Sequence, residues 1–157
     1  PGGESSALLK LMAPIAQWQS AVADFIRRGG VLFATCAGLI LSADTVCPKQ
    51  ASLSLLPVTV ERNAYGRQRE SFVAQGQCHE PALSDQPIEM VMIRAPRITQ
   101  CGEGVRVLVS YQGEPMMVQS GQVIAASFHP ELSQTTTVHE YFCQQAGMTG
   151  LQSASLN

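Results

Sequence analysis

Residues 31–40 read Val-Leu-Phe-Ala-Thr-Cys-Ala-Gly-Leu-Ile: a short apolar run, small residues around one cysteine, and a second apolar run. The first run predicts a buried strand and the second a helix. A nucleophile with small neighbours between a strand and a helix is typical of the nucleophile elbow G-x-S-x-G, here with Cys in place of Ser. Ala34 and Gly38 are the small neighbours of Cys36. The pattern predicts a nucleophilic Cys36; the alternative is an ordinary buried cysteine.

The predicted turn places Cys36 at the N-terminus of the following helix. The helix dipole and the unpaired N–H groups there favour a negative charge. Since the thiolate is the reactive form of cysteine, we expect this position to stabilise the thiolate of Cys36.

The composition is that of one folded domain. The chain has 157 residues, of which 45% are apolar and 14% charged, enough to build a core. The net charge is −2, without a basic stripe, so nothing indicates nucleic-acid binding. We find no membrane-length run and no leader, and therefore expect no membrane association and a cytoplasmic protein. We expect a single domain over residues 1–157, with a disordered tail from about residue 147.

The cysteines give no sign of a metal site or a disulfide framework. Their number, five, is odd, and the sequence contains neither C-x-x-C nor a Cys/His cluster with zinc spacing. A chain of this size and composition is also not typical of disulfide-rich proteins. We therefore predict no metal ligands.

Helices are predicted mainly near the two ends of the chain, with strands between them. Gly29 and Gly30 end a helix just before the elbow, and Pro57 indicates an edge strand or an irregular one. This order predicts an α/β protein with three layers and an antiparallel patch in its sheet. The predicted helices span residues 7–12, 14–28, 39–43 and 138–146, and the predicted strands span 31–33, 53–60, 70–74, 88–93, 105–111, 115–119 and 122–128.

A cysteine nucleophile needs a base, and His129 is the best candidate. It follows the apolar stretch 125–128, at the end of a predicted buried strand, where functional groups of α/β sheets lie. Glu131 lies two positions later, on the same side of an extended chain, and Pro130 stiffens the link. We therefore predict the nucleophile, base and orienting carboxylate in the order Cys36, His129, Glu131. The counter-candidate, His139, is expected on a helix surface, and His79 in an exposed loop.

Five stretches of the chain, in order, resemble the glutaminase subunit of pyridoxal 5′-phosphate synthase, a class I (triad) glutamine amidotransferase. The resemblance runs from Pro1 to about Phe142. The elbow and His-Pro-Glu are shared by all triad amidotransferases, whereas the third and fourth stretches separate this subfamily from its relatives. The stretches are Pro-Gly-Gly-Glu-Ser (1–5), Ala-Thr-Cys-Ala-Gly-Leu (34–39), Glu-Arg-Asn-Ala-Tyr-Gly-Arg-Gln (61–68), Ile-Arg-Ala-Pro (93–96) and Ser-Phe-His-Pro-Glu-Leu (127–132).

The resemblance implies a flavodoxin-like class I amidotransferase fold with a mixed sheet. It also implies hydrolysis of L-glutamine to glutamate and ammonia, with the ammonia channelled to a synthase subunit in a large hetero-oligomer. No cofactor or metal of the chain's own is implied. The implied oxyanion donors are the backbone amides of Gly3 and Ala37. The implied glutamine-binding residues are Gly3, Glu4, Ser5, Arg62, Ile93 and Arg94.

The sequence departs from the family pattern in three places. The family begins with a strand, a helix and a second strand ahead of the Pro-Gly-Gly loop, so we expect an N-terminally truncated fold. Ala34 replaces a usual glycine, and residues 133–137 lack the usual charges. Two alternatives stay open: a truncated, non-catalytic relative that binds or regulates the synthase, or another triad glutaminase or γ-glutamyl hydrolase.

Overall fold

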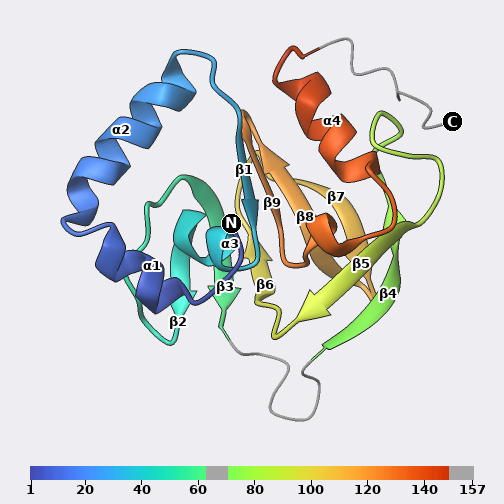
Figure 1. Ribbon diagram of the computed structural model, residues 1–157, viewed down its shortest axis with the longest axis horizontal. Helices are drawn as coiled ribbons and strands as arrows, with labels where there is room; N and C mark the ends of the chain where they lie inside the picture. Colours follow the sequence, from blue (N-terminus) through green and yellow to red (C-terminus); the bar gives the residue numbers. More distant parts are fainter. Residues whose placement is uncertain (63–70, 149–157) are drawn as a thin grey trace, which may run out of the picture.

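The computed structural model describes residues 1–62 and 71–148. Within these residues the chain forms four α-helices, a 3-10 helix and nine strands (Figure 1). The helices are α1 (Ser5–Leu11), α2 (Ile15–Arg27), α3 (Ala37–Ser42), η1 (Pro130–Leu132, the 3-10 helix) and α4 (Thr137–Gln145). The strands are β1 (Leu32–Thr35), β2 (Ala43–Cys47), β3 (Leu56–Glu61), β4 (Ser71–Cys78), β5 (Ile88–Ile93), β6 (Arg97–Cys101), β7 (Arg106–Tyr111), β8 (Glu114–Ser120) and β9 (Val123–Ala126).

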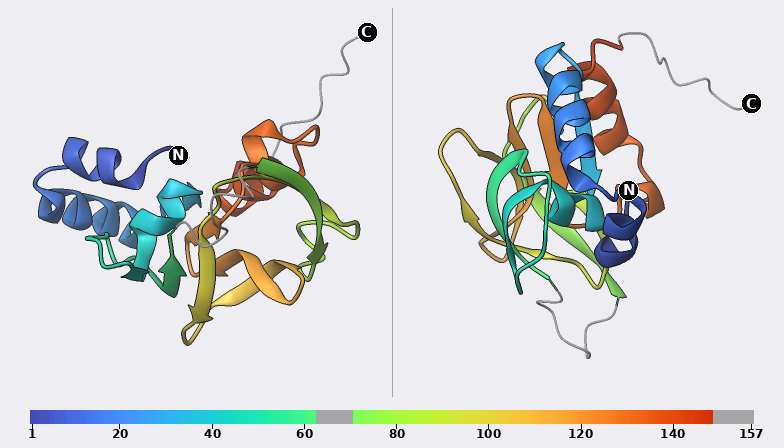
Figure 2. Two further views of the ribbon diagram at one scale, coloured as in Figure 1. Left: turned by 90° about the horizontal axis from the view of Figure 1, so that it is seen from below. Right: turned by 90° about the vertical axis from the view of Figure 1, so that its left-hand side faces the viewer.

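The larger sheet is mixed. In the described part of the chain it has six strands in the order β1-β9-β8-β7-β4-β5. The β1–β9 pair is parallel and the other neighbouring pairs are antiparallel. The left view of Figure 2 shows that the strands of the sheet curve strongly. The parallel pair positions the site, because Cys36 and His129 follow the carboxyl ends of β1 and β9. The predicted α/β class with a mixed sheet is confirmed.

A smaller sheet, β2-β3-β6, lies beside the larger one. Neither β2 nor β6 was predicted: β2 starts at Ala43, where the helix was expected to continue, and β6 exposes four of its five residues. Pro57 lies in β3, which is the central strand, so the edge interpretation is wrong. The alternative of an irregular strand is right, because the β2–β3 register shifts opposite Pro57, between Ala43 and Thr45.

Helix α3 lies at the centre of the molecule, and all six of its residues are buried. Its Leu39 packs in an apolar cluster with side chains of both sheets, among them Val60 and Val118. A second cluster fills the space under α4 and includes Phe128 and Tyr141. Burying each such side chain stabilises the fold by about 1.5–3 kcal/mol. The elbow is therefore held between tightly packed layers.

Helices α1 and α2 lie to one side of the sheets (Figure 2). No residue of α2 is buried, and its Trp18 and Phe25 are each 47% exposed. The N-terminal loop before α1 nevertheless runs back to α3, and the N-terminus lies beside that helix (Figure 1). This path brings residues 1–5 to the elbow.

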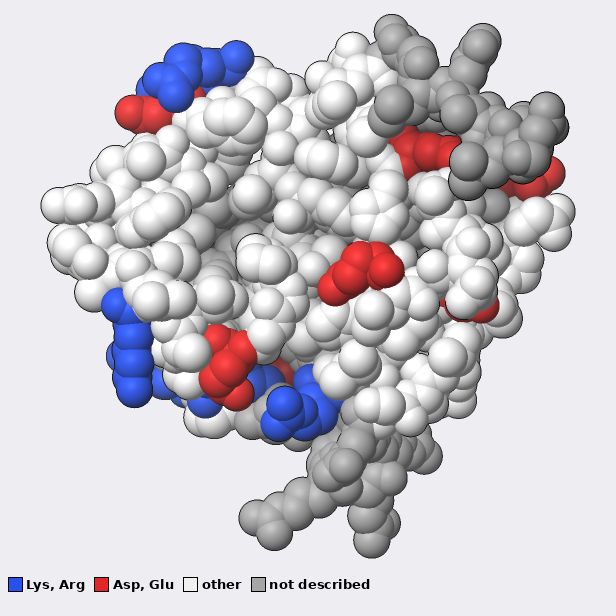
Figure 3. Space-filling model, in the orientation of Figure 1, with Lys and Arg blue, Asp and Glu red and all other residues white. Residues whose placement is uncertain are grey.

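The surface shows few charges. On the face in Figure 3, Lys and Arg side chains lie in separate groups with uncharged surface between them. In residues 1–62 and 71–148, every helix is too short or too polar to cross a membrane.

Candidate active site

The elbow forms as a sharp turn between β1 and α3. Thr35 pairs with Ala126 of β9, and the Cys36 amide donates to the Ala126 carbonyl at 2.9 Å. Cys36 then adopts φ 49° and ψ −106°, a conformation that costs a non-glycine residue on the order of 1–3 kcal/mol. A methyl group at Gly38 would lie 3.5 Å from the Ala34 Cβ and 3.4 Å from Pro1, which is ordinary van der Waals contact, so any small residue meets the space requirement there. Ala34 fits, so its methyl in place of a glycine is accommodated.

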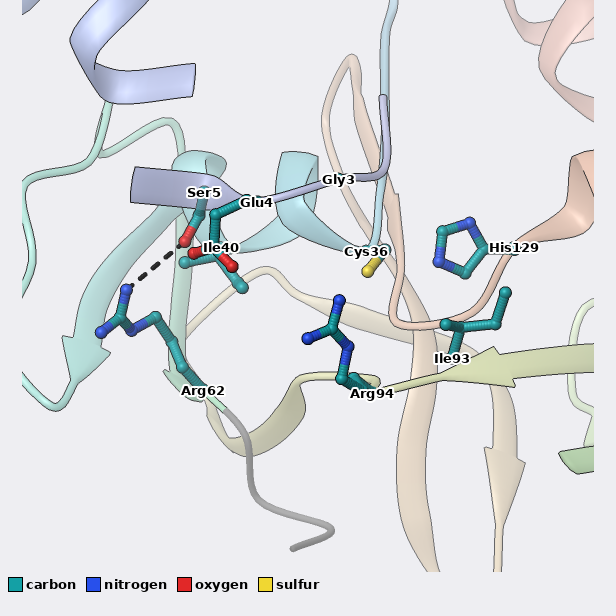
Figure 4. Close-up of a pocket in the computed structure, with 9 residues that line it drawn as sticks. All are labelled: Gly3, Glu4, Ser5, Cys36, Ile40, Arg62, Ile93, Arg94 and His129. Carbon is teal, nitrogen blue, oxygen red and sulfur yellow. Dashed lines mark hydrogen bonds between the residues drawn. The ribbon is translucent and has the colours of Figure 1, made fainter. Parts of the chain in front are cut away.

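His129 lies beside Cys36 in the pocket (Figure 4). Its amide donates to the Val91 carbonyl of β5 at 2.9 Å, and its side chain is almost fully buried. Its Nδ1 lies 2.8 Å from Glu131 Oε1, which leaves Nε2 as the nitrogen for proton transfer. The contact was predicted for an extended chain. That geometry is wrong: residues 130–132 form the 3-10 helix η1, with Pro130 in its first turn.

Glu131 is a carboxylate at neutral pH. Partial burial raises its pKa, but the hydrogen bond with His129 and a backbone amide lower it more, so the pKa lies below its usual 4.5. A carboxylate accepts a hydrogen bond from Nδ1–H. Glu131 therefore selects the tautomer in which Nε2 can act as a base.

The Cys36 thiol lies between two backbone amides. Burial raises its pKa above the usual 9.0, although hydrogen bonds from the amides of Ala37 and Gly3 lower it. Glu131 raises it further and Arg94 lowers it. The amide at the start of α3 lowers the pKa, as expected for a helix N-terminus, but burial outweighs it and the net shift is upward. The sulfur needs a base to take its proton.

This pKa shift predicts how Cys36 reacts with pH. In a His129→Gln variant, where no imidazole shares the proton, alkylation of Cys36 by iodoacetamide should reach half its maximal rate above pH 9.0. Peptide mapping by mass spectrometry separates Cys36 from the exposed Cys47, which serves as internal reference. A midpoint for Cys36 below pH 9.0 would contradict the raised pKa.

The two amides that reach the sulfur come from different parts of the chain. Ala37 is the first residue of α3, whereas Gly3 lies in the N-terminal loop with φ +122°, a conformation that favours glycine. The loop is fixed to the elbow by the Gly38 amide, which donates to the Pro1 carbonyl at 3.0 Å. Two N–H groups that converge beside a nucleophile form the arrangement that stabilises an oxyanion.

A pocket of about 260 Å³ opens above Cys36 (Figure 4). It brings together all six residues predicted to bind glutamine, along with Cys36 and His129 of the predicted triad. Ala37 and Glu131 lie behind the lining, Ala37 as an amide donor and Glu131 as the partner of His129. The lining residues are Gly3, Glu4, Ser5, Cys36, Ile40, Arg62, Ile93, Arg94 and His129.

The two arginines of the pocket have different surroundings. Arg94 follows β5 at φ 42°, is exposed, and points toward Cys36, whose pKa its charge lowers (Figure 4). The Arg62 guanidinium instead lies 3.5 Å from Ser5 Oγ and donates to the side chain of Gln50. Arg94 is therefore the cation freer to bind an incoming anion. The rest of the motif that contains Arg62, residues 63–68, lies outside the described residues.

Comparison with known proteins agrees with this site. Residues 1–147 match the model of the SNO glutamine amidotransferase family. The chain belongs to the SNO glutamine amidotransferase family. It is 42% identical over 147 residues to the pyridoxal 5′-phosphate synthase subunit PdxT of Kosmotoga olearia, covering 92% of this chain and 75% of that protein. It is 45% identical over 144 residues to PdxT of Niallia circulans, covering 90% and 73%.

The fold of this SNO family member is also shared by a solved structure. A crystal structure of a glutamine amidotransferase superposes with a TM-score of 0.83 at 39% identity, covering 94% of this chain and 77% of that one. The predicted class I amidotransferase fold is thereby confirmed, as is the predicted family.

Sequence reasoning missed two residues of the site. Ile40 lines the pocket from α3, one helical turn after Cys36. Its position four residues after Cys36 in a predicted helix could have identified it from the sequence. Gln50 accepts a hydrogen bond from Ser5 Oγ at 3.0 Å and one from Arg62, and so joins the N-terminal loop to the end of β3. It lies in a loop, and no local pattern marks it.

The other histidines do not line the pocket. His79 is exposed, as expected, and its Nε2 lies 2.7 Å from Ser110 Oγ. His139 is half-buried rather than on the surface, because its ring packs edge-on against Phe33 at 6.1 Å. All five cysteines are free thiols. No cluster of three potential metal ligands occurs among residues 1–62 and 71–148.

Proposed function

We propose that this chain hydrolyses the side-chain amide of L-glutamine to glutamate and ammonia, and that a synthase subunit uses the ammonia to make pyridoxal 5′-phosphate. The observation that carries the proposal is the convergence, in one pocket, of a cysteine, two amides at its sulfur and a histidine bonded to a carboxylate. The names of the PdxT relatives support the same reaction.

The reaction begins when His129 Nε2 takes the proton of the Cys36 thiol. The sulfur then attacks the amide carbon of glutamine, and the carbonyl oxygen becomes an oxyanion held by the amides of Gly3 and Ala37. The imidazolium is stabilised by Glu131 and passes its proton to the departing nitrogen. The C–N bond breaks, ammonia leaves, and a thioester remains on Cys36.

Hydrolysis reverses these roles. His129 takes a proton from water, and the hydroxide adds to the thioester carbon at the same oxyanion site. Collapse breaks the C–S bond and releases glutamate, and the proton returns to the sulfur. Each oxyanion donor contributes about two to three orders of magnitude in rate.

The pocket's charges suit the α-amino acid end of glutamine. Arg94 is the best partner for the carboxylate, with Arg62 behind the Ser5 hydroxyl. Glu4 is the carboxylate in the lining and suits the ammonium group. Gly3 and Ile93 bound the part of the pocket next to the sulfur (Figure 4).

In the test, the purified chain is mixed with the synthase subunit from the organism of one of the PdxT relatives. The glutamate and the ammonia released from L-glutamine are then measured. We expect equal amounts of both products, formed faster than by either protein alone. The synthase subunit without this chain is the control. Absence of glutamate in the mixture would reject catalysis and favour the non-catalytic alternative. We further propose a cytoplasmic hetero-oligomer of the two proteins, which co-elution on size-exclusion chromatography would test.

A further inference from the structure

Gly2 lies against the ring of His129. A methyl group on its Cα would lie 2.4 Å from His129 Cε1, 3.0 Å from Nδ1 and 3.5 Å from Nε2. Side-chain carbons do not approach other atoms within 3.0 Å without displacing them. The φ of Gly2 is outside the left-handed range, unlike that of Gly3, so its backbone does not call for glycine. The reason for glycine at position 2 is the space that the imidazole occupies.

Neither side of this contact is free to move away. The ring is held by Glu131 at Nδ1, and its backbone by the Val91 carbonyl of β5. On the other side, the Pro1 carbonyl accepts a hydrogen bond from the Gly38 amide, and the Gly3 amide lies close enough to the Cys36 thiol to lower its pKa. Gly2 is therefore the point at which the loop that carries an oxyanion donor meets the base.

We propose that Gly2 is a positioning residue that couples the N-terminal loop to His129. The Gly3 amide reaches the sulfur only when Gly2 is seated on the imidazole, so the oxyanion donor and the base take up their working positions together. Any event that lifts the loop removes the oxyanion donor and, at the same time, the contact that Gly2 makes with the imidazole. The catalytic role inferred for Gly2 rests on the proposed function, whereas the contact between Gly2 and His129 does not depend on it.

Gly2→Ala tests the coupling. Either the loop or the ring must shift, and a misplacement of about 1 Å costs roughly a hundredfold in rate. We expect kcat for glutamine hydrolysis to fall by about that factor. The KM should rise less than kcat falls, because Arg94, the proposed partner of the carboxylate, comes from the end of β5, although Glu4 lies in the loop.

Gly30→Ala is the matched control. A methyl group at Gly30 would also lie 2.4 Å from an aromatic ring, that of Phe25, and the φ of Gly30 is likewise outside the left-handed range. Neither Gly30 nor Phe25 lines the pocket. This variant should keep kcat within twofold of the wild-type value. A general effect of crowding a glycine would appear in both variants.

A spectroscopic reading separates positioning from a merely structural effect. The chain has three histidines, and ¹³C-histidine labelling gives one Cε1–H signal for each, with His129 assigned through His129→Gln. Gly2→Ala should shift the His129 signal, and Gly30→Ala should not. An unchanged His129 signal, or an unchanged kcat with a shifted signal, would overturn the proposal. If the wild-type pair releases no glutamate, the proposed function fails, and the His129 signal still decides whether the contact exists.

Discussion

Replacing Cys36 with alanine should reduce glutamate release by about 10⁶-fold, the size of loss seen when a triad nucleophile is removed. Among residues 1–62 and 71–148, Cys36 is the only one that brings a thiol to the pocket lining, and its backbone is held in a strained turn that exposes the side chain there. Alanine keeps the small size that the turn demands, so the fold should survive. The pocket would then bind glutamine without forming a thioester.

The measurement is steady-state glutamate release in the presence of the synthase subunit, with circular dichroism to confirm folding. Cys101→Ala is the matched control, because Cys101 is an exposed free cysteine at the end of β6 and does not line the pocket. Turnover by Cys36→Ala comparable to that of Cys101→Ala would mean that another group is the nucleophile.

His129→Gln should lower kcat by about 10⁴-fold, the upper end of the range for loss of a general acid–base. The expected loss is large because the imidazole acts twice. It removes a proton from a thiol whose pKa burial has raised, and it protonates the departing ammonia. Glutamine keeps a polar side chain of similar length, but it cannot accept and return a proton.

The control here is His79→Gln, which changes an exposed histidine whose ring contacts Ser110 and not the pocket. It should leave kcat within twofold of the wild-type value. Binding of glutamine, measured calorimetrically, should persist in His129→Gln. Equal kcat values for the two histidine variants would exclude His129 as the base.

Much of the fold could be predicted because its signals are local. The elbow combines a strand, small residues and a helix within residues 31–40, and β5 is a mostly apolar run whose bounds match the prediction, 88–93. The pairing of His129 with Glu131 was predicted from their two-residue spacing in an extended chain, although the backbone turned out to be a 3-10 turn. Residues two positions apart stay close together whichever conformation the chain adopts, so the two side chains can meet in either case.

The missed features depend on contacts between distant residues. Strand β6 exposes most of its residues and is a strand only because β3 pairs with it, as the register of Glu61 with Arg97 shows. Gln50 became a site residue through Ser5 and Arg62, which lie 45 and 12 positions away. The raised pKa of Cys36 also depends on distant residues. Burial raises this pKa, and burial is set by the whole core, whereas the start of a helix can be predicted from the local sequence.

Strand β5 has a consequence for substrate choice. Its Val91 carbonyl fixes the backbone of His129, and three residues later the chain presents Arg94. In the proposed function, β5 therefore sets the separation between His129, the base, and Arg94, the partner of the substrate carboxylate. An amino acid shorter by one methylene, such as asparagine, anchored at Arg94, would hold its amide carbon short of the position that the amide carbon of glutamine reaches. Selection by length would then come from the rigidity of one strand rather than from any contact with the extra carbon.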